Sequence, residues 1–209
     1  TVDTFNAPGT DPHDVPYLAV NILREGASKP LPGAWPSEMP FRPYVVIDVH
    51  STRVAVLGYL TDDSAVLTEE TVGTIDVLET AWSDKSNDVS TTDVVLLEDW
   101  VEHLRKPVSM GGEEADVVVL LSHIGHRRLN ADGDVGSGDG NDELLGDQGG
   151  VAPPDLVVSG HWHTWTATAW QPSNLNYKTT NVEAASYAQY VGEVTLTAGG
   201  RYISAAKHP

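Results

Sequence analysis

The chain has 209 residues, of which 30 are acidic and 12 are basic, so its formal net charge is −18. This charge argues against a nucleic acid polymer or an anionic membrane surface as a partner, because both are polyanions. No apolar run is long enough to span a bilayer, and the absence of cysteine excludes disulfides and thiolate metal ligands.

The first part of the chain predicts short strands joined by polar loops. Pro16 to Ile22 is predicted to form a strand. Residues 26–43 are rich in proline and glycine, which is typical of a surface loop, and a role as one wall of a substrate cleft stays open. Two further strands, Tyr44 to Ile47 and Val54 to Leu60, are predicted to form a hairpin with Asp48-Val49-His50 in its turn.

The middle of the chain predicts an amphipathic helix followed by buried strands. The helix begins at a Thr92-Asp93 cap and stops at Lys106-Pro107. Its apolar residues recur at the spacing of one helix face: Val94, Leu97, Val101 and Leu104. Val117 to Leu121 and Asp155 to Ser159 are apolar runs typical of parallel strands that are covered on both faces. A helix that leads into a buried strand is half of a crossover unit, so the predicted fold class is α/β.

Residues 130–150 are the most polar stretch, and they predict an acidic, glycine-rich loop. Asp132, Asp134 and Glu143 have the spacing of an EF-hand loop, but Gly136 and Ser137 stand where such a loop needs a ligand and a glycine. A calcium site within residues 132–143 and a solvated loop therefore both stay open.

Each of the two buried strands ends at a turn that carries histidine. His123 follows the first strand, and His161 and His163 follow the second, after Gly160. Ligands in α/β folds gather outside the carboxyl ends of parallel strands, so the two turns are expected to face one cleft. Imidazole is a common transition-metal ligand, and the three histidines therefore predict a metal site. A solvated or hydrogen-bonded role for each ring stays open, because His161 and His163 would point to opposite faces of an ideal strand.

The same residues carry a resemblance to a known family. Residues 121–125 (Leu-Ser-His-Ile-Gly) and 158–163 (Val-Ser-Gly-His-Trp-His) resemble the last two signature blocks of the calcineurin-like metallophosphoesterases, which include secreted 5′-nucleotidases. Other parts of the chain are similar to the middle and the closing strands of the nucleotidase-type catalytic domain: residues 16–21, 54–58, 181–185 and 190–194. The resemblance implies a layered sandwich of mixed β-sheets flanked by helices.

The earlier signature blocks of that family have no counterpart in the proper position. Asp11-Pro12-His13 follows no strand, Asp48-Val49-His50 lies in the predicted hairpin turn, and Gly140-Asn141-Asp142 lacks the histidine. Residues 1–209 are therefore expected to be the C-terminal portion of a single metallophosphoesterase-like domain. The missing ligands would come from an N-terminal segment, which is either upstream, on a separate chain or lost.

The resemblance implies a phosphoester hydrolase, either a phosphomonoesterase or a 5′-nucleotidase-like enzyme, that acts on a small phosphoester. Two divalent ions of manganese, zinc or iron would activate a bridging hydroxide. By the family pattern His123 and His161 bind one ion and His163 binds the other. The leaving-group histidine belongs to a missing block, so no catalytic residue is assigned, and the isolated chain is expected to bind metal weakly and turn over poorly.

Two alternatives remain, a secreted acidic calcium-binding module and a non-catalytic member of the family. The absence of cysteine suits an exported protein, so the expected location is periplasmic or extracellular.

Overall fold

The computed structural model describes residues 16, 18–20, 22–24, 32, 42–60, 75–77, 91–123, 153–160, 163, 165–170, 179–185, 187 and 189–209. In chain order the elements are β1 (Ile22–Arg24), β2 (Tyr44–Val49), β3 (Thr52–Leu60), β4 (Ile75–Val77), α2 (Thr91–Arg105), the single-turn 3-10 helix η1 (Val108–Met110), β5 (Val117–His123), β6 (Leu156–Ser159), β7 (Trp165–Trp170), β8 (Thr179–Ala184), β9 (Val191–Leu196) and β10 (Tyr202–His208).

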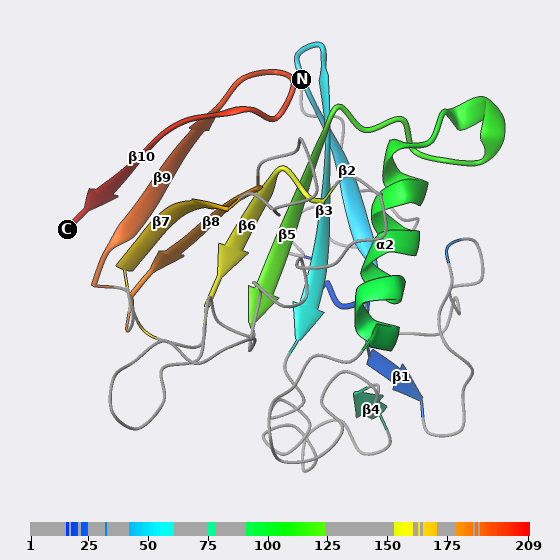
Figure 1. Ribbon diagram of the computed structural model, residues 1–209, viewed down its shortest axis with the longest axis horizontal. Helices are drawn as coiled ribbons and strands as arrows, with labels where there is room; N and C mark the ends of the chain where they lie inside the picture. Colours follow the sequence, from blue (N-terminus) through cyan, green and yellow to red (C-terminus); the bar gives the residue numbers. More distant parts are fainter. Residues whose placement is uncertain are drawn as a thin grey trace.

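The described strands form one large mixed sheet and two small antiparallel pairs (Figure 1). The six-stranded sheet has the order β2-β3-β5-β6-β8-β7, in which β3, β5, β6 and β8 run parallel. β2 and β7 lie at the two edges and run antiparallel to their neighbours. The small pairs are β1 with β4 and β9 with β10. The predicted mixed α/β class is confirmed. Strands β5 and β6, which lead into the predicted histidine-bearing turns, are central and parallel.

Helix α2 covers one face of this sheet, and the hydrophobic core lies between them (Figure 1). Its buried side chains include three of those predicted from the spacing, Leu97, Val101 and Leu104, together with Trp100. They pack against the facing side chains of β3 and β5: Ala55, Leu57, Tyr59, Val118 and Leu120. The helix thereby fixes the central strands from one side.

The opposite face of the central strands is less covered than predicted. Successive strand residues alternate between faces, so Leu121 of β5 and Val158 of β6 point away from α2, and they are paired in register. They are 40% and 37% exposed. The β9–β10 hairpin contacts the sheet nearer its β7 edge, where Gly192 lies beside Ala184, and it does not shield the centre.

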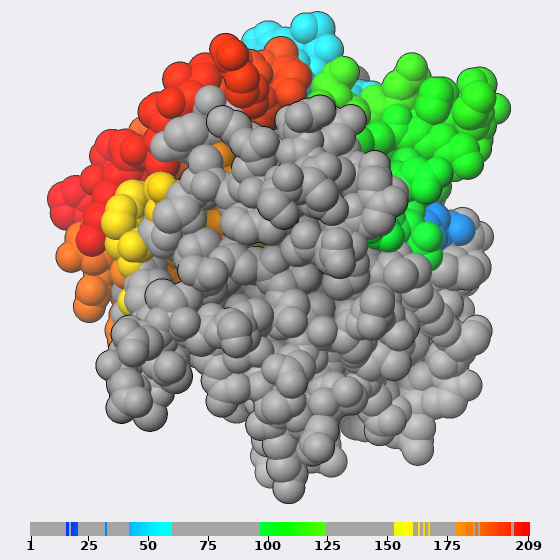
Figure 2. All heavy atoms as spheres, viewed as in Figure 1, coloured from blue at the N-terminus to red at the C-terminus, as the bar shows by residue number. Residues whose placement is uncertain are grey.

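The β2–β3 hairpin is confirmed, but its turn is tighter than predicted: Asp48 and Val49 are the last residues of β2, and only His50 of the three lies in the turn. His50 has a left-handed backbone with φ 57°, as a tight turn requires. Because β3 begins just after this turn and runs parallel to β5, the turn lies at the amino end of the parallel strands. Figure 2 shows this hairpin (cyan) and the segment that follows α2 (green) at the same end of the molecular surface.

The predicted strand from Pro16 to Ile22 is wrong. Leu18 makes an isolated parallel bridge with Arg42, and the Val20 N–H donates to the Gly58 carbonyl at 2.9 Å. The segment therefore lies against Gly58 of β3, where a Cβ atom would come within 2.1 Å of the Leu18 carbonyl oxygen. The segment before Ile22 therefore packs closely against β3 without forming a regular strand ladder, and strand β1 starts only at Ile22.

Two sequence predictions lie outside the described residues. These are the acidic loop of residues 130–150, with its calcium site, and most of the proposed cleft wall of residues 26–43. Among the helices that the structure describes, none has the length and apolar character needed to cross a membrane.

Candidate functional site

Strands β5 and β6, which lead into the predicted histidine-bearing turns, end side by side at the centre of the sheet. β5 ends at His123 and β6 ends at Ser159, with Ser122 and Ser159 opposite each other in register. The Gly160 N–H donates to the Ser122 carbonyl at 2.9 Å, so the contact continues one residue beyond β6. The carboxyl ends of β5, β6 and β8 therefore form one rim, here called the carboxyl rim.

The His123 ring lies against Gly160. A Cβ atom on residue 160 would be 2.9 Å from His123 Nδ1 and 3.4 Å from Cε1. Glycine therefore leaves a space that the imidazole uses, and any larger residue would displace the ring. His123 is exposed at the carboxyl rim, where a ligand can approach it.

His163 also lies at the carboxyl rim, three residues after Gly160. Its backbone is left-handed, with φ 60°, which costs about 1–2 kcal/mol for a residue with a side chain. Its exposed ring contacts the Tyr187 ring, with centroids 5.2 Å apart and planes inclined by 59°. Tyr187 follows β8, the parallel neighbour of β6, so this contact joins two adjacent loops of the rim.

The predicted three-histidine site is described only in part. His123 is the last residue of β5 and His163 follows the adjacent parallel strand β6, whereas His161 lies outside the described residues. Within the part of the chain that the structure describes, no three His, Asp or Glu side chains are grouped closely enough to hold a metal ion. Joint coordination of an ion by His123, His161 and His163 stays a prediction.

Sequence reasoning missed a row of buried and half-buried polar residues just beneath the carboxyl rim. Tyr59, Ser122, Ser159 and Glu183 are in register across β3, β5, β6 and β8. Tyr59 and Glu183 are each 1% exposed, and Ser159 Oγ donates to Asn181 Oδ1 at 2.6 Å. Polar groups at such depth are costly unless they are hydrogen-bonded, so the row is a specific feature of this end of the sheet. The sequence signal that could have revealed this row is a serine directly before each histidine-bearing turn.

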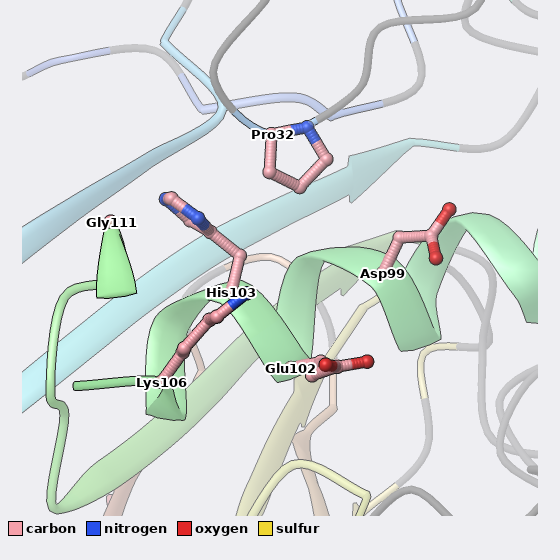
Figure 3. A pocket seen from close by; sticks show the side chains of 6 residues that line it. All are labelled: Pro32, Asp99, Glu102, His103, Lys106 and Gly111. Carbon is pink, nitrogen blue, oxygen red and sulfur yellow. The ribbon is translucent and has the colours of Figure 1, made fainter.

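A cavity of about 390 Å³ lies beside helix α2 (Figure 3). Its lining residues come mainly from α2 and the segment that follows it: Pro32, Asp99, Glu102, His103, Lys106 and Gly111. The Glu113 N–H donates to the His103 carbonyl and the Ala115 N–H to the Leu104 carbonyl, at 3.2 and 2.8 Å. These bonds join the end of α2 to the segment that starts β5. The cavity is therefore distinct from the cleft predicted at the carboxyl ends of the strands.

His103, which lines this cavity, lies against Tyr44 of β2. The Tyr44 hydroxyl donates to Glu113 Oε1 at 2.7 Å and lies 3.3 Å from His103 Nε2. Burial, together with the Glu113 carboxylate, raises the pKa of Tyr44 above its usual range. The Tyr44 ring also lies 5.8 Å from that of Trp100, so these contacts fasten β2 to α2. Their role is structural.

Comparison with known proteins gives similarity in both sequence and fold. No family model matches the chain. It is 25% identical over 205 residues to the trifunctional nucleotide phosphoesterase YfkN of Bacillus subtilis. The alignment covers 94% of this chain and 12% of YfkN. A solved structure of this relative, named a calcineurin-like phosphoesterase, has a TM-score of 0.50 at 17% identity and covers 93% of this chain and 56% of that one.

Two structures from Thermus thermophilus share the fold more closely. The 5′-nucleotidase precursor is 20% identical with a TM-score of 0.54, over 92% of this chain and 33% of its own. The sulfate thiohydrolase SoxB is also 20% identical, with a TM-score of 0.55 over 92% of this chain and 27% of its own. The chain thus spans a minor part of these proteins, and the part that it matches is a C-terminal part of the domain. The expected family resemblance is confirmed.

Proposed function

We propose, from this resemblance to calcineurin-like phosphoesterases and 5′-nucleotidases, that the chain is part of a metal-dependent hydrolase of small phosphoesters, either a phosphomonoesterase or a 5′-nucleotidase-like enzyme. The names of the relatives supply the reaction class. One observation carries the proposal to this chain: the His123 imidazole lies against Gly160, where the ends of two parallel strands meet. Because the fold also occurs in a sulfate thiohydrolase, the fold alone does not decide the reaction.

Three histidines are proposed as the metal ligands: His123, His161 and His163. The chemistry of this donor set supports the assignment, because neutral imidazoles suit manganese, zinc and iron. The space beside Gly160 is a second support, since it admits a ring at the rim. When bound, two divalent ions supply Lewis acidity toward a phosphoryl group and lower the pKa of water.

The residues of this chain would orient the site and set its charge. His123 is held by the end of β5, and His163 by a left-handed turn after β6, so the two rings approach the rim from neighbouring strands. The net charge of −18 repels a phosphate group, and cations at the rim would reverse that field locally. Imidazoles bring no negative charge themselves, so tight metal binding requires further ligands.

Metal binding is the first test of this proposal. Calorimetric titration of manganese into the protein is expected to show binding that weakens at least about tenfold in His123→Ala and in His163→Ala. His50→Asn is the matched control, because it removes an imidazole at the amino end of the strands and asparagine tolerates a left-handed backbone. Unchanged affinity in all histidine variants of the rim would refute the assignment of ligands.

Activity is the second test. The longest natural chain that contains these residues is expected to hydrolyse p-nitrophenyl phosphate or adenosine monophosphate with manganese, and to stop when a chelator is added. His163→Ala should lower kcat/KM by about a hundredfold or more, while His50→Asn should not change it. Metal binding without turnover in that longer chain would identify a non-catalytic relative. The alternative calcium site lies within residues 132–143, outside the described residues, and stays a prediction.

We also propose a periplasmic or extracellular location. The absence of cysteine supports it, because exported proteins that lack thiols avoid unwanted oxidation. Fractionation of the native host is the direct test, and recovery from the cytoplasm would contradict the proposal.

A further inference from the structure

The aromatic pair of His163 and Tyr187 is a feature of the carboxyl rim that the proposed ligand set does not account for. Their ring centroids are 5.2 Å apart and the ring planes are inclined by 59°. His163 follows β6 and Tyr187 follows β8, and these two strands are paired in parallel. The contact therefore bridges two loops that emerge at neighbouring positions of the rim.

Both residues of the pair have a left-handed backbone, which histidine tolerates better than tyrosine does. The φ angles are 60° for His163 and 57° for Tyr187, and Ala185 on the same loop has φ 63°. A left-handed backbone is uncommon for residues other than glycine, and it is an outlier for a bulky side chain such as tyrosine. Such strain persists where the surrounding structure imposes it, and it concentrates at functional sites. The other two described residues of this kind, His50 and Glu114, lie at the opposite end of the strands.

Burial does not explain why Tyr187 takes this conformation. The residue is 83% exposed, so it gains little from the removal of apolar surface from water. Its ring is instead placed against His163, at a centroid distance within the range of about 4.5–7 Å where aromatic pairs attract. The strained loop after β8 thus presents an aromatic ring to an imidazole at the rim.

We propose that Tyr187 is a positioning residue that holds the His163 imidazole in the orientation needed for metal binding. The inference rests on the proposed function, because it requires His163 to be a ligand. A contact between rings restrains an imidazole without engaging its nitrogens, so both stay available for an ion and for a hydrogen bond. Side chains that orient a ligating histidine typically change metal affinity about 10–100-fold when they are removed.

The test compares two substitutions of Tyr187 in the 209-residue chain. Tyr187→Asn removes the ring but keeps a residue that tolerates the left-handed backbone, and Tyr187→Phe keeps the ring without its hydroxyl. The dissociation constant for manganese, measured by calorimetry, is expected to rise about tenfold in Tyr187→Asn and to stay within about twofold in Tyr187→Phe. Ile203→Thr changes another exposed apolar side chain, on β10, and should leave the constant unchanged.

His163→Ala separates the two proposals. If it weakens metal binding and Tyr187→Asn does not, the positioning role is overturned while the proposed ligand stands. If His163→Ala has no effect on metal binding, the ligand assignment fails, and the positioning role fails with it.

A second readout needs no metal. The ring signals of His163 in the nuclear magnetic resonance spectrum of the metal-free protein should shift in Tyr187→Asn, because the ring current of the neighbouring aromatic is lost, and much less in Tyr187→Phe. Signals that do not move in Tyr187→Asn would overturn the inference even if manganese binds too weakly to measure.

Discussion

A single hydrogen atom in place of a methyl group at residue 160 decides where the His123 imidazole can lie. The nearest atom to a Cβ at this position is His123 Nδ1, at 2.9 Å, which is shorter than such contacts allow. The atom in conflict belongs to an exposed side chain rather than to the backbone, so the ring can move aside at small cost. Gly160 therefore matters for the direction of the imidazole more than for folding.

The variant Gly160→Ala should separate these two effects. We expect the free energy of unfolding to change by less than about 1 kcal/mol, because the displaced ring lies at the surface. The affinity for manganese should fall about tenfold or more, since the ring of the proposed ligand His123 would be turned from its site. Urea denaturation and calorimetry measure the two quantities.

Gly199→Ala is the matched control for Gly160→Ala. A Cβ at Gly199, in the turn between β9 and β10, has no atom within 4 Å. This variant should leave both stability and metal affinity unchanged. An unaltered manganese affinity in Gly160→Ala would mean that the position of the His123 ring is irrelevant to metal binding.

Sequence patterns located the residues of the rim but not their contacts. His123 and His163 were placed at strand ends because an apolar run that stops at a polar turn marks the end of a buried strand. The contact between His123 and Gly160 depends on the register of two strands more than thirty residues apart, which no local pattern encodes. Tyr187 lies in an irregular loop and carries no periodic signal.

At the scale of elements, one ion pair ties helix α2 to the start of two strands. Arg105 Nη2 donates to Asp155 Oδ2 at 3.0 Å and to the Pro153 carbonyl at 2.8 Å, while the same Asp155 oxygen accepts the Val118 N–H at 2.8 Å. Burial raises the pKa of Asp155, and the Arg105 charge and the Val118 hydrogen bond oppose that rise. The guanidinium thus lets the last turn of α2, the start of β5 and the residue before β6 meet around a charged carboxylate.

Removal of this guanidinium should make stability depend more steeply on pH. In Arg105→Gln the pKa of Asp155 in the folded state should rise further above its unfolded value. A group whose folded-state pKa is raised loses its contribution to the free energy of unfolding as the pH rises through that pKa. Because this pKa is higher in the variant, the variant should lose more stability near neutral pH than the native protein does. We expect a loss of about 2 kcal/mol at about pH 7, and a smaller loss at about pH 3.5, because the Asp155 carboxylate gains a proton in both proteins as the pH falls.

Urea denaturation over this pH range measures the effect of Arg105→Gln. Lys106→Gln is the matched control, because it removes one positive charge from an exposed neighbour in sequence. The control should show a small loss that varies little with pH. A loss of equal size at both ends of the range for Arg105→Gln would show that Asp155 does not depend on this charge.

Elements whose ends are marked by local sequence signals were predicted well, and those whose position depends on distant contacts were not. Helix α2 was placed within a residue or two because its apolar spacing and the proline after it are local signals, but the predicted cap is wrong, since Thr92 and Asp93 lie inside its first turn. The strand predicted from Pro16 failed because the path of that segment is set by Gly58, far along the chain. The shielding of Leu121 and Val158 was overstated for a related reason, since coverage of a sheet face depends on where other elements pack.

At the scale of the whole molecule, composition determines an electrostatic property that no single contact reveals. Thirty acidic residues stand against twelve basic ones, so the folded chain carries strong self-repulsion at neutral pH. Composition and strand pattern predicted the class of fold. They did not predict that helix α2 packs on one face of the sheet while the centre of the other face stays partly exposed, because this coverage follows from tertiary packing.

Self-repulsion of this size should make the protein more stable as salt is added. The Debye length falls from about 30 Å at 0.01 M salt to about 3 Å at 1 M, so repulsion between distant carboxylates is screened. We expect the unfolding temperature at pH 7 to rise by about 3 °C or more over that range of sodium chloride, as a gain of about 1 kcal/mol would produce. A chelator must be present throughout, because a bound metal would stabilise the folded state by mass action.

At a pH near the sequence pI of about 4.5 the net charge is close to zero, so the same salt series should have little effect there. An unfolding temperature that falls with salt at pH 7 would instead mean that local ion pairs, such as that of Arg105 with Asp155, outweigh the repulsion among the acidic residues.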